Sequence, residues 1–324
     1  MNKILDRINN PQDLKKLSVR ELARLAREIR ALILEVVSQN GGHLSPNLGV
    51  VELTLALHYV FNAPQDKIIW DVGHQCYTHK IVTGRKEKFR TIRQYQGLCG
   101  FPSREESEYD ILNTGHASTA LSAALGMAVA RDKKKEDYHV VAVVGDGSLT
   151  GGMAWEALNQ IGHLREKLII VLNYNEMSIS HNVGALSKYL SYLVSGQYYL
   201  RMKDFAKTIL RSIPAVGWPM IKVARAVEEA IKKTFFPGFL FEELGIRYLG
   251  PVQGHSLVSL IEVFEEAKTS PGPILIHCVT QKGKGYKPAQ NNPAKYHSIS
   301  PFDLKTGQVL SSNSRPTYSS IFGK

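Results

Sequence analysis

Residues 139–148 read HVVAVVGDGS and residues 168–176 read LIIVLNYNE, and these two stretches decide the fold. Each begins with a short run of β-branched and aliphatic residues, which is typical of a buried strand. Between them, residues 153–162, MAWEALNQIG, carry apolar side chains at helical spacing. A strand, a helix and a strand in this order predict a right-handed crossover that joins two parallel strands. We therefore predict an α/β fold in which helices flank a parallel sheet.

Polar residues follow both predicted strands directly. Asp146 lies in a Gly-Asp-Gly-Ser turn after the first strand, and Asn175 follows the second. Because the carboxyl ends of parallel strands meet at one edge of a sheet, both side chains should reach the same crevice. Carboxylate and amide oxygens suit Mg²⁺, which commonly completes its shell with phosphate oxygens and water. The glycines also let backbone N–H groups approach a diphosphate, so the sequence predicts a magnesium-diphosphate site.

The Gly-Asp-Gly turn has two other interpretations. It could be a simple turn, or part of a dinucleotide-binding fingerprint. The glycines at 145, 147, 151 and 152 do not have the spacing GxGxxG. Asp146 would also repel a pyrophosphate that approached without a metal ion, so the dinucleotide interpretation is disfavoured.

The composition indicates an ordinary soluble protein. The chain has 324 residues, 44% of them hydrophobic, which is enough for a substantial core. No apolar run approaches the roughly 20 residues that span a bilayer. The first residues include Asp6 and Asp13 and lack the organisation of a signal peptide. A cytoplasmic protein without a membrane partner is therefore expected.

The net charge of +11 is compatible with nucleic acid, phosphorylated substrates or an acidic partner. Many basic residues fall between 201 and 233, where no nucleic-acid-binding motif is found. We expect a solvated or partner-facing surface there and no nucleic-acid partner. The cysteines Cys76, Cys99 and Cys278 are few and widely spaced, which predicts reduced thiols. No second ligand pair at zinc spacing follows His74, Cys76 and His79, so a structural zinc is not expected.

The remaining segments extend the α/β pattern. We predict a domain over 1–310 that includes a basic helical insertion at about 187–237, and a linker over 311–324, where Ser, Asn and Pro replace any periodic pattern. The motif Gly115-His-Ala-Ser-Thr119 is expected to open a helix through Ala130. The other predicted elements are helices at 18–38, 49–61, 77–84, 86–93 and 257–269 and strands at 67–70, 247–249 and 273–280.

Together these segments resemble the amino-terminal half of the 1-deoxy-D-xylulose-5-phosphate synthases, a family of thiamine diphosphate enzymes related to transketolase. The resemblance covers nearly the whole chain. It is carried by GGHLSPNLGVVELTLALHYVF, IIWDVGHQCYTHKIVTGR, GFPSREESEYD, TGHAST, GDGS, NEMSIS, NVGAL, FFPGFLFEELG, YLGPVQGH, KGKGY and PTYSSIFGK. It implies the transketolase-like domain that grips the diphosphate of thiamine diphosphate together with Mg²⁺.

The resemblance also implies roles for individual residues. The metal ligands would be the side chains of Asp146 and Asn175 and the backbone carbonyl of Met177. His43 and His297 would face the reacting centre, where proton transfers need groups that titrate near neutral pH. The implied contacts to thiamine diphosphate are His74, Gly115, His116, Ala117, Gly147, Ser148, Asn175, Lys282 and Tyr286.

Some of these residues have simpler explanations. His43 could be an ordinary loop histidine, and His116 could only cap the helix that follows it. Lys282 could neutralise a phosphate or belong to a glycine turn. His58, His163 and His255 have no comparable context and are expected to be structural.

The chain departs from the family pattern in three ways. Tyr174 stands where the family commonly has Asp, beside the predicted metal ligands, and Ala117 stands where it commonly has Ser. The sequence also stops where the family's second domain is expected to begin. That domain supplies the glutamate that contacts the aminopyrimidine ring and most of the basic residues that hold the substrate phosphate.

The implied reaction is the condensation of pyruvate with glyceraldehyde 3-phosphate to 1-deoxy-D-xylulose 5-phosphate and CO₂. This chain would supply the diphosphate-binding half and would be inactive without the carboxy-terminal half, in a homodimer or a heterotetramer. Two alternatives stay open. One is a split transketolase-type subunit that acts on another sugar phosphate or 2-keto acid, and the other is a non-catalytic remnant that binds the cofactor.

Overall fold

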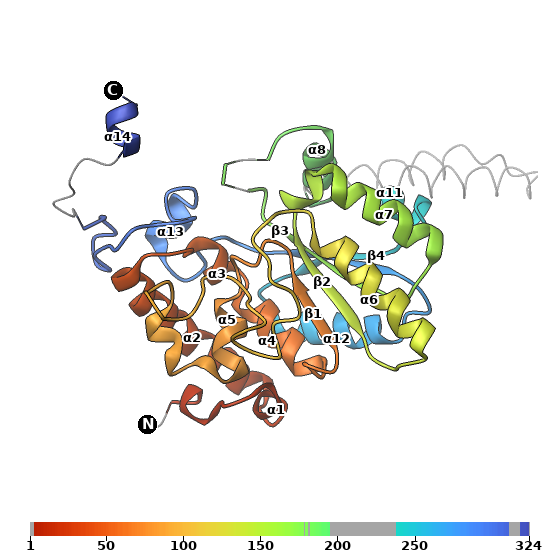
Figure 1. The fold of residues 1–324 in the computed structure, drawn as a ribbon, viewed down its shortest axis with the longest axis horizontal. Helices are drawn as coiled ribbons and strands as arrows, with labels where there is room; N and C mark the ends of the chain where they lie inside the picture. Colours follow the sequence, from red (N-terminus) through yellow and green to blue (C-terminus); the bar gives the residue numbers. More distant parts are fainter. Residues whose placement is uncertain (1–2, 178, 181, 195–237, 311–317, 324) are drawn as a thin grey trace, which may run out of the picture.

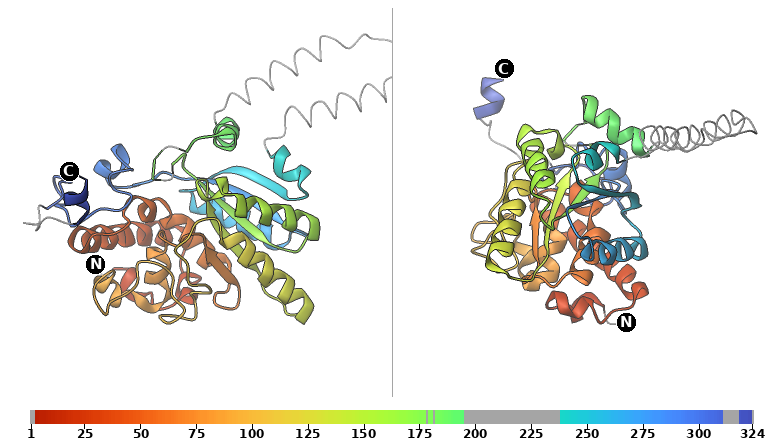
Figure 2. Two further views of the ribbon diagram at one scale, coloured as in Figure 1. Left: turned by 45° about the horizontal axis from the view of Figure 1, so that its top comes forward. Right: turned by 90° about the vertical axis from the view of Figure 1, so that its right-hand side faces the viewer.

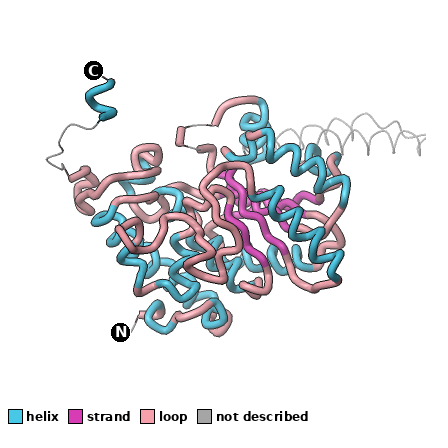
Figure 3. The backbone as a smooth tube through the Cα atoms, viewed as in Figure 1, coloured by secondary structure: helices cyan, strands magenta, loops and turns pink. Residues whose placement is uncertain are grey.

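A five-stranded parallel sheet forms the centre of the molecule. The computed structural model describes residues 3–177, 179–180, 182–194, 238–310 and 318–323. The strands lie in the order β1-β2-β3-β5-β4, and each neighbouring pair is parallel. Figures 1 and 3 show this sheet with helices around it. Their bounds are β1 Lys67–Trp70, β2 Val140–Gly145, β3 Ile169–Tyr174, β4 Arg247–Gln253 and β5 Ile274–Val279. The predicted fold class is confirmed.

Helices cover both faces of the sheet (Figure 2). Because side chains alternate along a strand, Val141 and Val143 pack on one face, while Val140, Ala142 and Val144 pack on the other. The first face is covered by α2 (Val19–Asn40), α4 (Val51–Val60) and α12 (Leu257–Lys268). The second is covered by α6 (Ala120–Lys134), α7 (Gly152–Leu164) and α8 (Ala185–Val194). Strands buried on both faces explain the continuous apolar runs of the sequence.

The helix α2 illustrates how local sequence sets an element. Its buried Leu22, Leu25, Ile29 and Ile33 recur at helical spacing and form one apolar stripe. Ser18 and Glu21 form a reciprocal capping box at its start. In the part of the chain that the structure describes, no helix is both long enough and apolar enough to cross a membrane.

Short helices and loops complete the fold. They are η1 Leu5–Arg7, α1 Pro11–Leu14, α3 Ser45–Gly49, α5 Tyr77–Lys80, η2 Ile81–Arg85, η3 Lys88–Thr91, η4 Ser148–Thr150, α11 Phe239–Glu243, α13 Lys287–Asn291 and α14 Tyr318–Phe322. Of the insertion predicted at 187–237, only residues 187–194 are described, and they belong to α8. Of the predicted linker, 311–317 and 324 lie outside the described residues, and Tyr318–Phe322 is helical.

Two predicted boundaries were wrong. The helix that follows the Gly115–Thr119 motif begins at Ala120 and continues past the predicted end at Ala130 to Lys134, where Lys135 in the left-handed conformation ends it. The helix predicted over 49–61 is observed as α4, Val51–Val60, and a separate short helix, α3, precedes it, because Val50 between them is not helical.

Candidate active site

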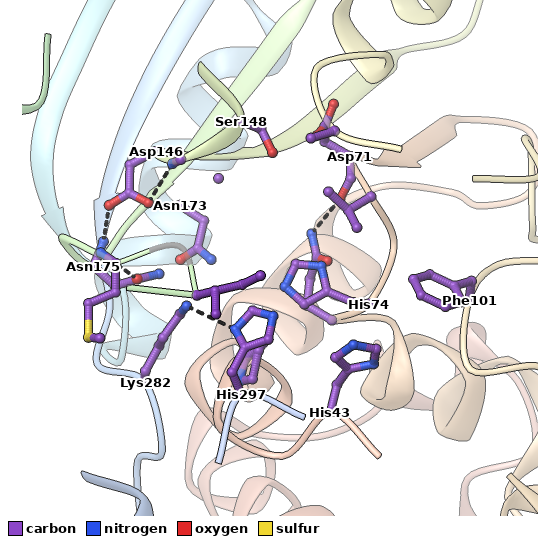
Figure 4. A pocket seen from close by; sticks show the side chains of 18 of the residues that line it. His43, Asp71, His74, Phe101, Asp146, Ser148, Asn173, Asn175, Lys282 and His297 are labelled. Atoms are coloured by element: carbon purple, nitrogen blue, oxygen red, sulfur yellow. Dashed lines mark hydrogen bonds between the residues drawn. The ribbon is translucent and has the colours of Figure 1, made fainter. Parts of the chain in front are cut away.

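A cavity of about 430 Å³ opens at the carboxyl edge of the sheet. It is lined by the residues that follow β1, β2, β3 and β5, together with the loops that carry His43 and Phe101. Figure 4 shows Asp146 and Asn175 at one end and His43 and Phe101 at the other. The loops that follow these strands therefore meet at one cavity, as expected for an open parallel sheet.

Asp146 lies at the first end of the cavity, together with Asn175. Its side chain is only 2% exposed. One carboxylate oxygen accepts the N–H of Gly147 at 2.8 Å, and the other accepts those of Asn175 at 2.9 Å and Glu176 at 2.7 Å. Burial raises the pKa of this carboxyl, although the three backbone hydrogen bonds oppose that shift. A bound cation would favour the charged form of such a buried carboxylate.

Asn175 and Met177 lie beside Asp146 in the cavity wall. The side-chain oxygen of Asn175 accepts the N–H of Met177 at 3.2 Å, which fixes the turn after β3. Across the described ranges, no group of three or more histidine, cysteine, aspartate or glutamate side chains could hold a metal ion. The predicted ligands are instead one carboxylate, one amide and one backbone carbonyl. These are hard oxygen donors that fit Mg²⁺, with phosphate oxygens and water completing its shell.

The Gly115–Thr119 motif is held at the cavity by Asp71, which follows β1. The buried carboxylate of Asp71 accepts the N–H of Ser118 at 2.9 Å and that of Ala120 at 3.0 Å. It therefore caps the start of α6 from a distant part of the chain. Gly115 and Ala117 line the cavity as a result, and Ser118 hydrogen bonds the carbonyl of Ser148 at 2.7 Å.

Three histidines cluster at the other end of the cavity. The ring centroids of His43, His74 and His297 lie 5.2–5.7 Å from one another. Burial lowers the pKa of His43 to about 4 and that of His74 well below its usual value, with neighbouring positive charge adding to the effect. Both rings are therefore neutral at neutral pH. Their Nδ1 atoms are buried without a hydrogen-bond partner, so these atoms are placed to meet a bound ligand.

Asn47 joins the loops of two of these histidines. Its side-chain amide donates to the carbonyls of His43 at 2.7 Å and His74 at 2.8 Å. Its side-chain oxygen accepts the N–H of Tyr77 at 2.8 Å. Asn47 is fully buried. The spacing of the two histidine loops thus depends on one amide side chain.

Lys282 enters the cavity between its two ends, from the loop after β5. Burial lowers its pKa to about 8, and the nearby charge of Asp146 opposes that shift. Its ammonium lies 3.5 Å from Nδ1 of His297 (Figure 4). Of the two interpretations of this lysine, its position in the cavity favours a group that faces a bound anion.

A buried charged chain supports the loop that carries Lys282. Nε2 of His255 accepts the N–H of Gln281 at 2.9 Å, so its Nδ1 carries the proton and donates to Glu52 at 3.0 Å. Glu52 also pairs with Arg30 in a bidentate arrangement. Burial alone would raise the pKa of Glu52, but the hydrogen bonds from His255 and Arg30 and the charge of Arg30 lower it to about 2. His255 is structural, as predicted, yet it supports the site.

Two predicted cofactor contacts lie outside the cavity lining. His116 is exposed, and it does not cap α6, whose N-cap is Thr119. The hydroxyl of Tyr286 donates to the carbonyl of Leu304 at 3.1 Å, and its ring packs on Tyr296. The roles proposed for His116 and Tyr286 stay predictions.

Tyr174, the departure beside the predicted metal ligands, points away from the cavity into the core. Its hydroxyl lies 3.0 Å from Glu176 and 2.9 Å from Ser191 of α8. It therefore ties the turn after β3 to α8. Cys76, in the same segment as His74 and His79, is buried, and burial raises the pKa of its thiol to about 12.

Sequence reasoning missed Asn47, Asp71 and Phe101. Asn47 follows a proline in a segment that resembles a turn, and Asp71 ends a strand as many turn residues do. Only their long-range backbone partners reveal their roles, and a single sequence contains no signal for those. Phe101 lies in a loop, and nothing in its local sequence indicates which residue of that loop reaches the cavity.

The fold of this chain is similar to that of transketolases of known structure. A transketolase from Campylobacter jejuni matches with a TM-score of 0.62 at 20% identity, over 87% of this chain and 41% of that one. A transketolase from Leishmania mexicana matches with a TM-score of 0.61 at 20% identity, over 88% and 39%. These likenesses show the fold.

Sequence comparison gives the family. A family model described as 1-deoxy-D-xylulose-5-phosphate synthase matches residues 5–280. The synthase of that name from Carboxydothermus hydrogenoformans is 55% identical over all of this chain and 52% of its own length. That from Caldanaerobacter subterraneus is 56% identical over 99% and 51%. The chain belongs to the 1-deoxy-D-xylulose-5-phosphate synthase family, as predicted, and it spans about half the length of the curated relatives it matches.

Proposed function

We propose that this chain binds thiamine diphosphate with Mg²⁺ and supplies the diphosphate-binding half of a 1-deoxy-D-xylulose-5-phosphate synthase. The observation that carries the proposal is the meeting of Asp146, Asn175 and Lys282 in one cavity at the carboxyl edge of the sheet. Membership of the synthase family supports the choice of cofactor.

The residues at the first end of the cavity would hold the diphosphate. Asp146 and Asn175 provide hard oxygen donors for the cation, together with the carbonyl of Met177. Gly115, Gly147 and Ser148 line the wall close to them. A Cβ atom built at Gly115 meets no atom within 4 Å, so the open wall leaves room for a ligand there. Lys282 would add a positive charge on the side of β5.

The histidines would serve the reacting end. When bound, thiamine diphosphate supplies a carbon nucleophile and an electron sink. His43 and His74 are neutral at neutral pH, so each ring can donate or accept one hydrogen bond and exchange a proton with a substrate oxygen. His297, in contact with both rings, would complete this group. Phe101 packs edge-on against His43 and keeps water away from that side of the ring.

The proposed reaction is the condensation of pyruvate with glyceraldehyde 3-phosphate to 1-deoxy-D-xylulose 5-phosphate and CO₂. The carboxy-terminal half of the relatives would complete the site, because the chain spans about half of their length. That half could be a separate chain or the continuation of this one. We propose a cytoplasmic homodimer or heterotetramer as the working assembly.

Isothermal calorimetry of thiamine diphosphate, with and without Mg²⁺, tests the cofactor proposal. We expect Mg²⁺-dependent binding by the 324-residue chain, loss of that binding in Asp146→Ala and Asp146→Asn, and no change in Asp132→Asn. Asp132 is a suitable control because its half-exposed carboxylate lies far from this cavity, beyond the opposite edge of the sheet. Release of CO₂ from pyruvate only after addition of the carboxy-terminal half would support the synthase. If no condition gave cofactor binding, the proposal would be refuted, and the chain would be a remnant without this function.

A further inference from the structure

Phe101 is presented to the cavity by a segment without regular secondary structure, residues 99–110. Its ring lies edge-on to His43, with the two ring centroids 5.5 Å apart. The next residue, Pro102, packs against Gly73, where an added Cβ would come within 2.3 Å of the proline ring. The segment therefore touches the loops of both His43 and His74. An irregular segment keeps such a position only if other contacts fix it.

Two acidic residues of the same segment fix its backbone. A carboxylate oxygen of Glu106 accepts the N–H of Cys99 at 2.5 Å, and one of Asp110 accepts the N–H of Ser103 at 2.8 Å. These two backbone groups stand two residues before and two residues after Phe101. The carboxylates thus hold the chain on both sides of the ring.

The carboxylates are themselves held by buried cationic and polar groups. Asp110, 3% exposed, accepts from Nε2 of His79 at 2.8 Å and from Arg85 at 2.7 and 2.9 Å. Glu106 pairs with the ammonium of Lys80, which is fully buried. His79 and Lys80 belong to α5, and Arg85 belongs to η2. A buried charge that loses its partner is costly, so each carboxylate is confined to one place.

We propose that Glu106 and Asp110 are positioning residues that hold Phe101 against His43 and so keep the reacting end of the cavity dry. The inference rests on the proposed function for the importance of His43, but its geometry does not depend on the cofactor. The acidic pair, together with His79, Lys80 and Arg85, forms a buried strap beneath the cavity wall. Its members reach Phe101 only through the backbone of residues 99–103.

The pKa of His43 can be used to measure whether this strap holds Phe101 in place. Burial is the main cause of its low pKa, and electrostatic interactions with His297 and Arg93 add to it. His74 also packs on the ring, and Lys282 lies behind His297. None of these neighbours belongs to the strap. A loosened Phe101 would admit water to His43 and raise its pKa while these other groups stay in place.

Histidine ring NMR of the full 324-residue chain tests the proposal. We expect the pKa of His43 to rise by about one unit or more in Phe101→Ala, and in the same direction in Glu106→Gln and Asp110→Asn. Amide hydrogen exchange at Cys99 and Ser103 should become about tenfold faster in the last two variants. These readouts need neither cofactor nor substrate, so they remain valid if thiamine diphosphate does not bind.

Glu28→Gln is the matched control. Its carboxylate also accepts a backbone N–H, that of Leu5 at 2.9 Å, and also pairs with an arginine, but it lies on α2 away from the cavity. A shift of the His43 pKa in Glu28→Gln as large as in Glu106→Gln would overturn the proposal, because general loosening would then explain both. An unchanged His43 pKa in folded Glu106→Gln would overturn it as well. Glu106, with 17% of its side chain exposed, decides the question even if Asp110→Asn fails to fold.

Discussion

Replacement of Asn47 by alanine should loosen the candidate site and destabilise the chain. The substitution removes two donors and one acceptor, and it leaves the carbonyls of His43 and His74 and the N–H of Tyr77 without their partner. The hydrogen bond from Tyr77 is buried and the two to the carbonyls are partly buried, around a side chain that is itself fully buried. A backbone group left unpaired away from water costs at least about 1 kcal/mol, so the free energy of unfolding should fall by about 2 to 3 kcal/mol. Urea unfolding followed by circular dichroism measures this loss.

Asn40→Ala is the control for this prediction. The side-chain amide of Asn40 also donates to two backbone carbonyls, those of Arg90 and Ile92, but one of these hydrogen bonds is exposed and the other is only partly buried. Water can replace the lost donors there, so the variant should lose less than about 1 kcal/mol. Equal losses in Asn47→Ala and Asn40→Ala, or a loss below about 1 kcal/mol in Asn47→Ala, would refute the reasoning from burial.

Two further predictions concern the supports of the cavity. Because the partners of Glu52 lower its pKa from 4.5 to about 2, its contribution to stability is fully present above about pH 5 and is lost as the pH falls toward 2. Unfolding measured between pH 6 and 3 should show this decline, with a shallower slope in Glu52→Gln; an unchanged slope would contradict it. Asp71→Ala should leave the N–H groups of Ser118 and Ala120 unpaired and lower the free energy of unfolding by about 2 kcal/mol. It should also speed amide exchange at the start of α6, whereas protection equal to the parent's would show that Asp71 does not cap the helix.

Much of the fold could be predicted from the sequence because its signals are local. The aliphatic runs of β2 and β3 indicate strands, and the glycines after β2 indicate a turn, from a few neighbouring residues alone. The order of the strands could not be predicted. β5 lies between β3 and β4, and nothing in the local sequence of a strand indicates which strands will pair with it. The proximity of Asp146 and Asn175 could be predicted because both follow strands, and the carboxyl ends of neighbouring parallel strands meet at one edge of the sheet.

The supports of the site escaped prediction for a different reason. Residues 103–110, SREESEYD, have the composition of a solvated loop, yet Asp110 is almost fully buried. A charged residue in a polar segment is normally exposed. Its burial here depends on His79 and Arg85, which lie about 25 to 31 residues earlier in the chain. Likewise, the N–H groups of Ser118 and Ala120 at the start of α6 donate to Asp71, which lies 47 and 49 residues earlier in the chain.

The pairing of β3 with β5 has a consequence for the order in which the molecule is assembled. The two strands are separated by about 100 residues, and the hydrogen bond from Thr280 to Asn173 closes a loop of 107. Contacts so distant in the chain form slowly, because the ends of a long loop must first meet. A ribosome must therefore release residues beyond Lys282 before the cavity can have its full wall. During synthesis, Asp146 and Asn175 leave the ribosome roughly 100 residues or more before Lys282, and so before the strand that completes the cavity wall.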